Sequence, residues 1–408
     1  MASRQILKFP EGFLWGAATA AHQIEGNNTN SDWWAWENSI KRHNQLIAKG
    51  KHPKDFCSDI ACDSYNRYDE DFALAQSLSH NATRLSIEWA RIEPKEGKFS
   101  EQEFEHYEKV LQSAKFHGLQ TFVTLQHFTL PLWFAAKGGF TRKENVVNFV
   151  KFAEAAVKRL DHLTDFWITI NEPEGYASGG YMTGVWPPGK KSFLLALKVV
   201  KNLAVAHQEI KDKLKTVTGK PIGIAYDIID YQPTNFFSGI IEKLFYDRIN
   251  KLVFYRTVDS CDFIGVNYYF HHHVGLFGKR TRSESHHKLT DVGWSIHPEG
   301  LENVVLKMKK YNKPIYITEN GIADVKDTKR EQFIKDHLRF LHRAISNGVD
   351  VKGYLYWSLL DNFEWEKGFW PRFGLIEIDR EDLLRRRIRS SSLAYAEICK
   401  KNYLDYEI

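Results

Sequence analysis

Short apolar runs alternate with longer amphipathic segments along almost the whole chain. The runs are rich in β-branched and aromatic residues and stop abruptly at polar residues, which is typical of buried strands. Eight such strands are predicted, at residues 13–18, 82–87, 121–125, 166–172, 222–225, 263–266, 314–319 and 353–356.

The segments between these strands repeat their apolar residues at helical spacing. Helices are predicted at residues 65–78, 104–116, 144–160, 196–214, 301–311 and 331–346, and residues 33–53 are expected to be rich in loops. Continuous apolar strands separated by helices imply a parallel sheet that is covered on its outer face. Eight such units predict the α/β class and a single (β/α)8 TIM barrel, with its chemistry at the C-terminal ends of the strands. Because no repeat, low-complexity tract or linker divides the chain, one domain is expected over residues 1–408.

Two of the predicted strands end in a glutamate, Glu172 and Glu319. A carboxylate at the end of a buried strand is unfavourable unless something requires it there, although a single glutamate could equally open an exposed loop. The repetition favours an active site with paired carboxylates. Further polar or aromatic residues lie on or just past the strands: Gln23, Arg84, His127, Asn171, Asn267, Tyr269 and Trp357.

Two carboxylates without a metal suit glycoside hydrolysis, in which one donates a proton to the leaving oxygen and the other attacks or activates water. The main chemical alternative is a metal site at the run His271 to His273, but no acidic residue stands at ligand spacing on a helix with these histidines. The sequence has no G-x-S-x-G nucleophile motif and no glycine-rich phosphate loop. Neither a metal nor a cofactor is therefore expected.

The composition agrees with a carbohydrate-binding protein without proving one. The chain has 12 Trp and 18 Tyr, and such amphipathic rings can stack on sugars, although most will pack in the core. The net charge of +5 is spread along the chain, and its one dense basic run, Arg385 to Arg387 with Arg389, is expected to be a solvated face. No nucleic-acid-binding module accompanies this run, so no nucleic acid partner is expected.

Four cysteines, Cys57, Cys62, Cys261 and Cys399, do not form a zinc-type pattern and are expected to be reduced thiols. No stretch approaches the roughly 18 consecutive apolar residues of a membrane span. The first ten residues lack the apolar run of a signal peptide. A cytoplasmic protein that does not associate with membranes is therefore expected, and its oligomeric state is left open.

At the level of whole motifs, the chain resembles glycoside hydrolase family 1, the β-glucosidase and β-galactosidase family. The resemblance covers residues 9–403, almost the whole chain. It is carried by the motifs FPEGFLWG (9–16), QIEG (23–26), TINEP (169–173), NYY (267–269), ITENG (317–321) and WSLLDNFEW (357–365).

The resemblance implies a retaining exo-β-glycosidase that acts on a β-glycoside or a short oligosaccharide through a covalent glycosyl-enzyme. Glu172 would be the general acid/base and Glu319 the nucleophile. Arg84 and Tyr269 would orient Glu319, and the Arg84 charge would lower the pKa of that carboxyl. Asn171, in the same motif as Glu172, would bind the sugar 2-hydroxyl. Assisting and sugar-binding positions are also implied for Asn267, Gln23, His127, Trp357, Glu364, Trp365 and Phe373.

Three departures from the family pattern concern the surroundings of the site. Phe128 stands where many members have a tryptophan, so one indole donor to the sugar is missing. The loops after the fifth and sixth predicted strands also look short. We therefore expect a wide mouth lined by aromatic residues on the leaving-group side, with inward packing as helix core as the alternative reading. The residues concerned are Phe236, Phe237, Phe254 and Tyr255.

Two other functions compete with the glycosidase. A catalytically inactive glycan-binding barrel is disfavoured because both carboxylates stand in intact motifs. A 6-phospho-β-glycosidase is disfavoured because Glu364 would repel a phosphate dianion. The preferred sugar, among glucose, galactose, fucose and mannose, is not determined by the sequence.

Overall fold

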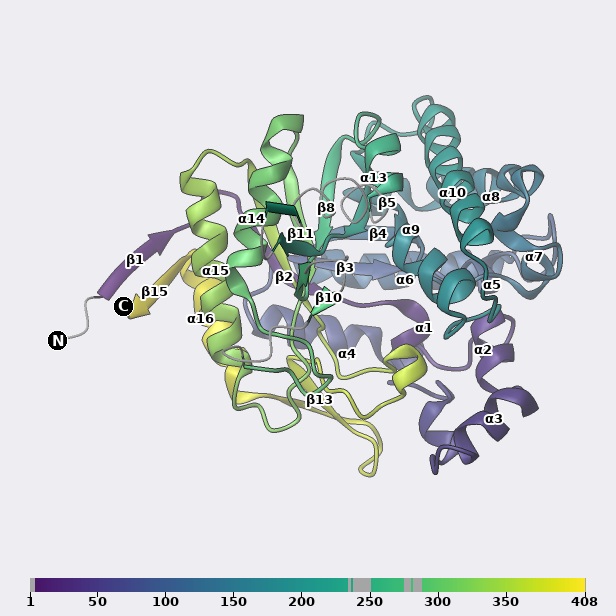
Figure 1. Cartoon of the computed structure of the whole chain (residues 1–408), viewed down its shortest axis with the longest axis horizontal. Helices are drawn as coiled ribbons and strands as arrows, with labels where there is room; N and C mark the ends of the chain where they lie inside the picture. Colours follow the sequence, from purple (N-terminus) through teal and green to yellow (C-terminus); the bar gives the residue numbers. More distant parts are fainter. Residues whose placement is uncertain (1–3, 234–235, 238–250, 275–279, 282–287, 408) are drawn as a thin grey trace.

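Eight parallel strands form a closed barrel, which confirms the predicted (β/α)8 fold (Figure 1). The structure, a computed structural model, describes residues 4–233, 236–237, 251–274, 280–281 and 288–407. The strands follow one another around the barrel in chain order, and β12 closes it against β2. They are β2 (Leu14–Ala18), β3 (Ala82–Ser86), β4 (Gln120–Gln126), β5 (Phe166–Asn171), β6 (Ile222–Asp227), β8 (Phe263–Asn267), β11 (Ile315–Asn320) and β12 (Val351–Trp357).

Helices surround the barrel, and the six predicted ones are present with ends shifted by a few residues (Figure 1). The long outer helices are α4 (Ser64–Ser77), α6 (Glu101–Phe116), α8 (Val146–Leu160), α10 (Phe193–Leu214), α14 (Pro298–Met308), α15 (Arg330–Ser346) and α16 (Ser390–Lys401). Shorter helices are α1 (Ala21–Ile24), α5 (Trp89–Ile92), α7 (Leu132–Ala136), α9 (Pro173–Ala177) and α13 (Leu252–Thr257).

The segment 33–53, expected to be rich in loops, is largely helical, so that prediction is wrong. It contains α2 (Asp32–Glu37) and α3 (Ile40–Ile47). Each begins after a serine whose hydroxyl accepts a hydrogen bond from a backbone N–H of the first turn: Ser31 from Trp34 and Ser39 from Arg42. These serine caps stabilise short helices that apolar spacing alone does not reveal.

Shorter strands complete the structure outside the barrel. They are β1 (Arg4–Lys8) paired with β15 (Tyr403–Glu407), β7 (Asp230–Pro233) with β9 (His271–Val274) and β10 (Arg280–Thr281), and β13 (Ile376–Asp379) with β14 (Arg385–Ile388). The β1–β15 ribbon leads directly into the start of β2, where Asn402 accepts a hydrogen bond from the Trp15 indole. This ribbon therefore lies at the N-terminal end of the barrel.

The barrel interior is filled near its N-terminal end by a floor of aromatic rings. Phe122 and Phe166 stack with ring centroids 4.2 Å apart, and Tyr316 and Phe263 pack edge-on against Phe122. Strand residues alternate between this interior and the larger core beneath the helices, as parallel barrel strands do. The floor leaves the C-terminal end of the barrel free for polar side chains.

The basic run at 385–389 is not the uniformly solvated face that we expected. The side chain of Arg386 is 1% exposed and forms an ion pair with Asp71 at 3.0 Å. Arg389, 7% exposed, pairs with buried Asp361 at 2.6 Å. Only Arg385 and Arg387 point outward, because alternate residues of β14 face opposite sides. The run therefore ties β13 and β14 to the body of the protein.

Replacing Arg386 by alanine is expected to destabilise the protein by about 3–5 kcal/mol, because the buried carboxylate of Asp71 would lose its cation. The neighbouring Arg385→Ala serves as the matched control and should cost less than about 1 kcal/mol, since its ion pair is exposed. Urea unfolding of both variants measures the difference. Equal stability of the two variants would contradict the assignment.

Candidate active site

A cavity of about 170 Å³ opens at the C-terminal end of the barrel and brings most of the predicted site residues together. It is lined by His127, Asn171, Glu172, Tyr269, Glu319, Trp357, Glu364 and Trp365 from the predicted set. Arg84 and Asn267 lie behind these side chains and hydrogen-bond to Glu319 and Glu172, respectively. Gln23 donates to Asn362 Oδ1 and to the Phe363 carbonyl, next to Glu364. Phe373 is 2% exposed and lies behind Tyr269, with ring centroids 6.4 Å apart, rather than at the cavity surface.

Glu319 is held from two sides at the end of β11. Arg84 Nη1 donates to its Oε1 at 2.5 Å, and the Tyr269 hydroxyl donates to its Oε2 at 2.6 Å. Burial raises the pKa of Glu319 above its ordinary value, although Arg84 and Tyr269 act to lower it. The Arg84 charge thus acts in the expected direction, but desolvation outweighs it and the pKa of Glu319 is raised overall.

Glu172 follows β5 with a left-handed backbone, φ 43° and ψ 60°. The pairing of β5 with β6 shifts register between Ile168 and Asn171, and such irregularities redirect side chains at strand ends. Both Asn171 and Glu172 consequently face the cavity. Asn267 Nδ2 donates to Glu172 Oε1 at 2.8 Å. Burial, followed by the charges of Asp227 and Glu319, raises the pKa of Glu172 well above its ordinary value.

A buried polar network fixes the two carboxylates relative to one another. Arg84 Nη2 donates to Asn171 Oδ1 at 2.6 Å, and Asn267 Nδ2 donates to the same oxygen at 3.1 Å. The Thr318 hydroxyl in turn donates to Asn267 Oδ1 at 2.7 Å. The amide of Asn171 is thereby oriented with its nitrogen toward His127 Nε2, 3.1 Å away.

Three buried polar atoms in or beside the cavity have no hydrogen-bond partner among the described residues. They are Gln23 Oε1, His127 Nδ1 and Glu364 Oε2. Burial raises the pKa of Glu364 to about 7. Unpaired buried polar atoms are costly, so these three are available to a polar ligand such as a sugar bearing hydroxyl groups.

Aromatic rings form the remaining walls. The rings of Trp357 and Trp365 are nearly parallel to that of His127, each with centroids 6.0 Å from it. Phe128, which replaces the family tryptophan, lies between Trp186 and Trp365 in the same wall. These flat surfaces suit the apolar face of a sugar ring.

Several cavity residues were not predicted from the sequence: Asp227, Phe270, Trp186, Trp294, Glu366 and Lys367. Asp227 ends β6 just as the two glutamates end their strands, so its position did carry a signal. Lys367 and Glu366 form an ion pair at 2.6 Å, and Glu366 also accepts a hydrogen bond from the Trp186 indole. Nothing in their local sequence distinguishes this pair from surface charges.

None of the four aromatic residues predicted to form a wide mouth lines the catalytic cavity. Phe254 is 2% exposed and packs as core of α13 against Tyr226 and Tyr311, so the inward-packing alternative is correct for this residue. Tyr255 borders a separate cavity between α13 and α14. Phe236 and Phe237 are exposed but do not line the catalytic cavity, and parts of both short loops fall outside the described residues.

Within the described part of the chain, no group of three acidic, histidine or cysteine side chains is arranged to hold a metal ion. The run His271 to His273 forms β9, where side chains alternate between opposite faces. The histidines are thus not gathered on one face as a three-ligand site would require.

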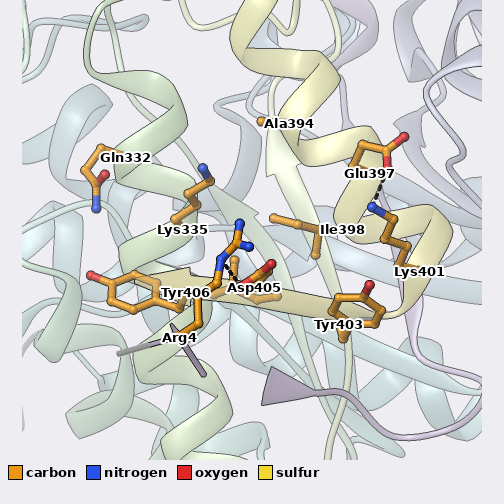
Figure 2. Close-up of a pocket in the computed structure, with 11 residues that line it drawn as sticks. Arg4, Gln332, Lys335, Ala394, Glu397, Ile398, Lys401, Tyr403, Asp405 and Tyr406 are labelled. Carbon is orange, nitrogen blue, oxygen red and sulfur yellow. Dashed lines mark ion pairs between the residues drawn. The ribbon is translucent and has the colours of Figure 1, made fainter. Parts of the chain in front are cut away.

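A larger cavity, of about 380 Å³, lies beside the β1–β15 ribbon at the other end of the barrel (Figure 2). Figure 2 shows two ion pairs among its charged side chains, Arg4 with Asp405 and Lys401 with Glu397. These are exposed surface pairs, so we place the site at the smaller cavity.

A (β/α)8 barrel that carries two buried carboxyl groups and unpaired polar atoms at the C-terminal ends of its strands fits a glycoside hydrolase. Residues 5–238 and 254–404 match glycosyl hydrolase family 1. The chain belongs to this family and is a retaining O-glycoside hydrolase. Among the described residues, no helix is long and apolar enough to span a membrane.

Relatives match along nearly their full length. β-Glucosidase A of Thermotoga maritima is 32% identical, with 98% of this chain and 99% of the relative covered. A β-galactosidase of Sulfolobus acidocaldarius is 29% identical, with 99% and 97% covered. Among solved structures, a β-glycosidase from Pyrococcus horikoshii is 37% identical with a TM-score of 0.87, covering 98% of this chain and 96% of that one.

A substitution at Gly175 of α9 tests how tightly the Glu172 carboxyl is positioned. A Cβ atom at Gly175 would lie 3.2 Å from Glu172 Oε2, closer than an ordinary contact. Gly175→Ala is therefore expected to displace the carboxyl and lower kcat/KM about tenfold, while helix stability stays equal or rises.

Gly219→Ala is the matched control, since a Cβ atom there meets nothing within 4 Å. Steady-state kinetics on aryl β-glycosides and thermal unfolding measure both effects. Unchanged kinetics of Gly175→Ala would show that Glu172 does not need this close packing.

Proposed function

We propose that this protein is a retaining exo-β-glucosidase that uses Glu319 as nucleophile and Glu172 as general acid/base. The observation that carries the proposal is the difference between the environments of the two carboxyl groups. The guanidinium and phenol that hold Glu319 act to lower its pKa against the effect of burial, whereas burial and two neighbouring carboxylates all raise the pKa of Glu172. Two carboxyls with unlike environments are what double displacement requires, one ionised and one protonated.

In the first step, a Glu319 oxygen attacks the anomeric carbon as the bond from that carbon to the leaving oxygen breaks. Glu172 transfers its proton to the leaving oxygen, and a glycosyl ester of Glu319 remains. Arg84 and Tyr269 keep the attacking carboxylate in place. Asn171, oriented by Arg84 and Asn267, offers its amide nitrogen to the sugar 2-hydroxyl.

In the second step, Glu172, now ionised, takes a proton from water. The resulting hydroxyl attacks the anomeric carbon and displaces Glu319, which regains its negative charge. Two inversions at the anomeric carbon restore the β configuration. Asn267 remains bonded to Glu172 and assists by holding the carboxyl toward the reacting atoms.

The non-reducing sugar is assigned to the side of the cavity built by β2, β4 and β12. Gln23, His127 and Glu364 carry the unpaired polar atoms that would bind its hydroxyls. Trp357 and Trp365 provide apolar surfaces, and Phe373 supports the wall from behind Tyr269. The relatives named β-glucosidase and β-galactosidase support glucose as the main sugar with galactose also accepted. Acceptance of fucose is part of the proposal without support from these names.

Anionic sugars are expected to be poor substrates. Among the described residues, the cavity lining includes five carboxyl groups, Glu172, Asp227, Glu319, Glu364 and Glu366, and one lysine, Lys367, which already pairs with Glu366. A phosphate dianion would be repelled by those carboxyl groups that are ionised, and it would find the lysine already paired. This argues against 6-phospho-β-glycosidase activity, and the presence of both catalytic glutamates argues against an inactive binding barrel.

The same proposal includes one catalytic domain over residues 1–408 and a cytoplasmic location. The location is supported by four buried cysteines that are free thiols.

Glu319→Ala is expected to lower hydrolysis by at least about 10⁴-fold, because no nucleophile remains. Azide should restore part of the turnover by entering the vacated space and should yield an α-glycosyl azide. Proton NMR identifies this product and, for the wild type, the β anomer of the first sugar released. Release of the α anomer by the wild type would contradict double displacement.

Glu172→Ala is expected to separate substrates by their leaving groups. Glycosides with a poor leaving group should react about 10²–10⁴-fold more slowly, since they require a proton. A dinitrophenyl glucoside needs none and should still form the glycosyl-enzyme, seen as a burst of dinitrophenol. Loss of that burst would rule Glu172 out as the acid.

A further inference from the structure

A third carboxylate, Asp227, faces the catalytic pair from the neighbouring strand. It is the last residue of β6 and stands in register with Asn267 of β8. The backbone N–H of Glu172 donates to the carbonyl of Ala225 on the same strand at 2.8 Å. The ends of β5, β6 and β8 therefore bring Glu172, Asp227 and Asn267 side by side.

The side chain of Asp227 points into the barrel. Ala225 packs in the inner core and Tyr226 in the outer core, so strand alternation directs Asp227 inward. It lines the same cavity as Glu172 and Glu319. The structure gives its carboxylate no hydrogen bond and no ion pair with any described residue, in contrast to the carboxylates of Glu172 and Glu319.

The charges around this position are unbalanced. Glu172 reaches it from β5, Glu319 from β11 and Glu174 from α9, and Tyr269 lies beside Glu319. Among the described residues of this site, Arg84 supplies the guanidinium, and it is committed to Glu319 and Asn171. His127 lies beyond Asn171 and is kept neutral, since burial and Arg84 lower its pKa. Several carboxyls that share one cation cannot all be ionised near neutral pH.

The surroundings set the order in which the three carboxyls lose their protons. Glu319 has both Arg84 and Tyr269 to stabilise its charge and ionises first. Burial and the charge of Glu319 raise the pKa of Asp227 to about 7. Glu172 follows last, because the anions of both neighbours oppose its ionisation.

We propose that Asp227 is a positioning residue for the acid: its carboxylate keeps the proton on Glu172 in neutral and mildly alkaline solution. The inference rests on the proposed role of Glu172. In the glycosyl-enzyme the charge of Glu319 is lost to the ester, whereas that of Asp227 persists. Asp227 then strengthens Glu172 as the base that accepts a proton from water.

The test compares the pH dependence of kcat/KM for wild type and Asp227→Asn from pH 5 to 9, using an alkyl β-glucoside. In Asp227→Asn, the fall of kcat/KM at alkaline pH (the alkaline limb of the profile) is expected to begin about one pH unit lower than in the wild type. At pH values above this fall, the variant should have about tenfold lower relative activity. The acid limb, set by Glu319, should stay in place. Asp227→Glu should retain a limb close to that of the wild type.

Glu366→Gln is the matched control, since it also removes a carboxylate from the cavity wall but one that the structure pairs with Lys367 and Trp186. Its alkaline limb should not move. With the dinitrophenyl glucoside, wild type and Asp227→Asn should behave alike at alkaline pH, because no proton is needed. A merely structural role of Asp227 would lower activity on both substrates equally and leave the limb in place.

An alkaline limb that is the same in wild type and Asp227→Asn would overturn the proposal. Should Asp227→Asn not fold, Asp227→Ser is measured instead. In either variant, ¹³C NMR of labelled glutamate carboxyls follows the ionisation of Glu172 directly, and an unshifted titration would also overturn it. Failure of the proposed function itself is seen separately, as loss of the dinitrophenol burst in Glu172→Ala.

Discussion

The site depends on one buried ion pair, between Arg84 and Glu319. The guanidinium is fully buried and also donates to Asn171, to the Thr124 hydroxyl and to the Thr318 carbonyl. It therefore links β3 with β4, β5 and β11 across the barrel interior. A buried charge without its partner is strongly destabilising. Barrel closure and catalytic geometry are consequently coupled, because a shift in strand register would expose the Arg84 charge or leave it buried without its partner.

The remaining polar groups are ordered by contact with that pair. Asn171 is oriented by Arg84, and Asn267 connects Asn171 to Glu172. Beneath them, the aromatic floor of Phe122, Phe166 and Tyr316 keeps the lower barrel dry and rigid. The upper network can thus hold its donors and acceptors in fixed positions, which is what makes preorganised electrostatic stabilisation effective.

Most of the fold and much of the site could be predicted from the sequence, because apolar runs that end in polar residues mark barrel strands directly. Glu172, Glu319 and their neighbours were found in this way or through the family resemblance. Features that arise only between distant segments were not. Tertiary packing brings Arg386 to Asp71 and the Trp186 indole to Glu366, and no local sequence pattern indicates either contact. The left-handed turn at Glu172 and the register shift beside it follow from packing rather than from propensity. Asp227 could have been predicted, since it lies at the end of a buried strand as the catalytic glutamates do. It was not, because glycoside hydrolysis requires only two carboxyl groups and both were already identified.

The concentration of acids in one cavity also has a thermodynamic side. Each buried carboxyl that must ionise for catalysis loses hydration and meets like charges, so it lowers the free energy of unfolding. The rest of the barrel has to supply a stability reserve for its own active centre. Amide replacements at Glu172 or Asp227 should then raise the melting temperature even as they impair turnover, a trade-off between stability and activity. Thermal unfolding of these variants would show it, and a lowered melting temperature would mean that the carboxyls hold the strand ends together instead.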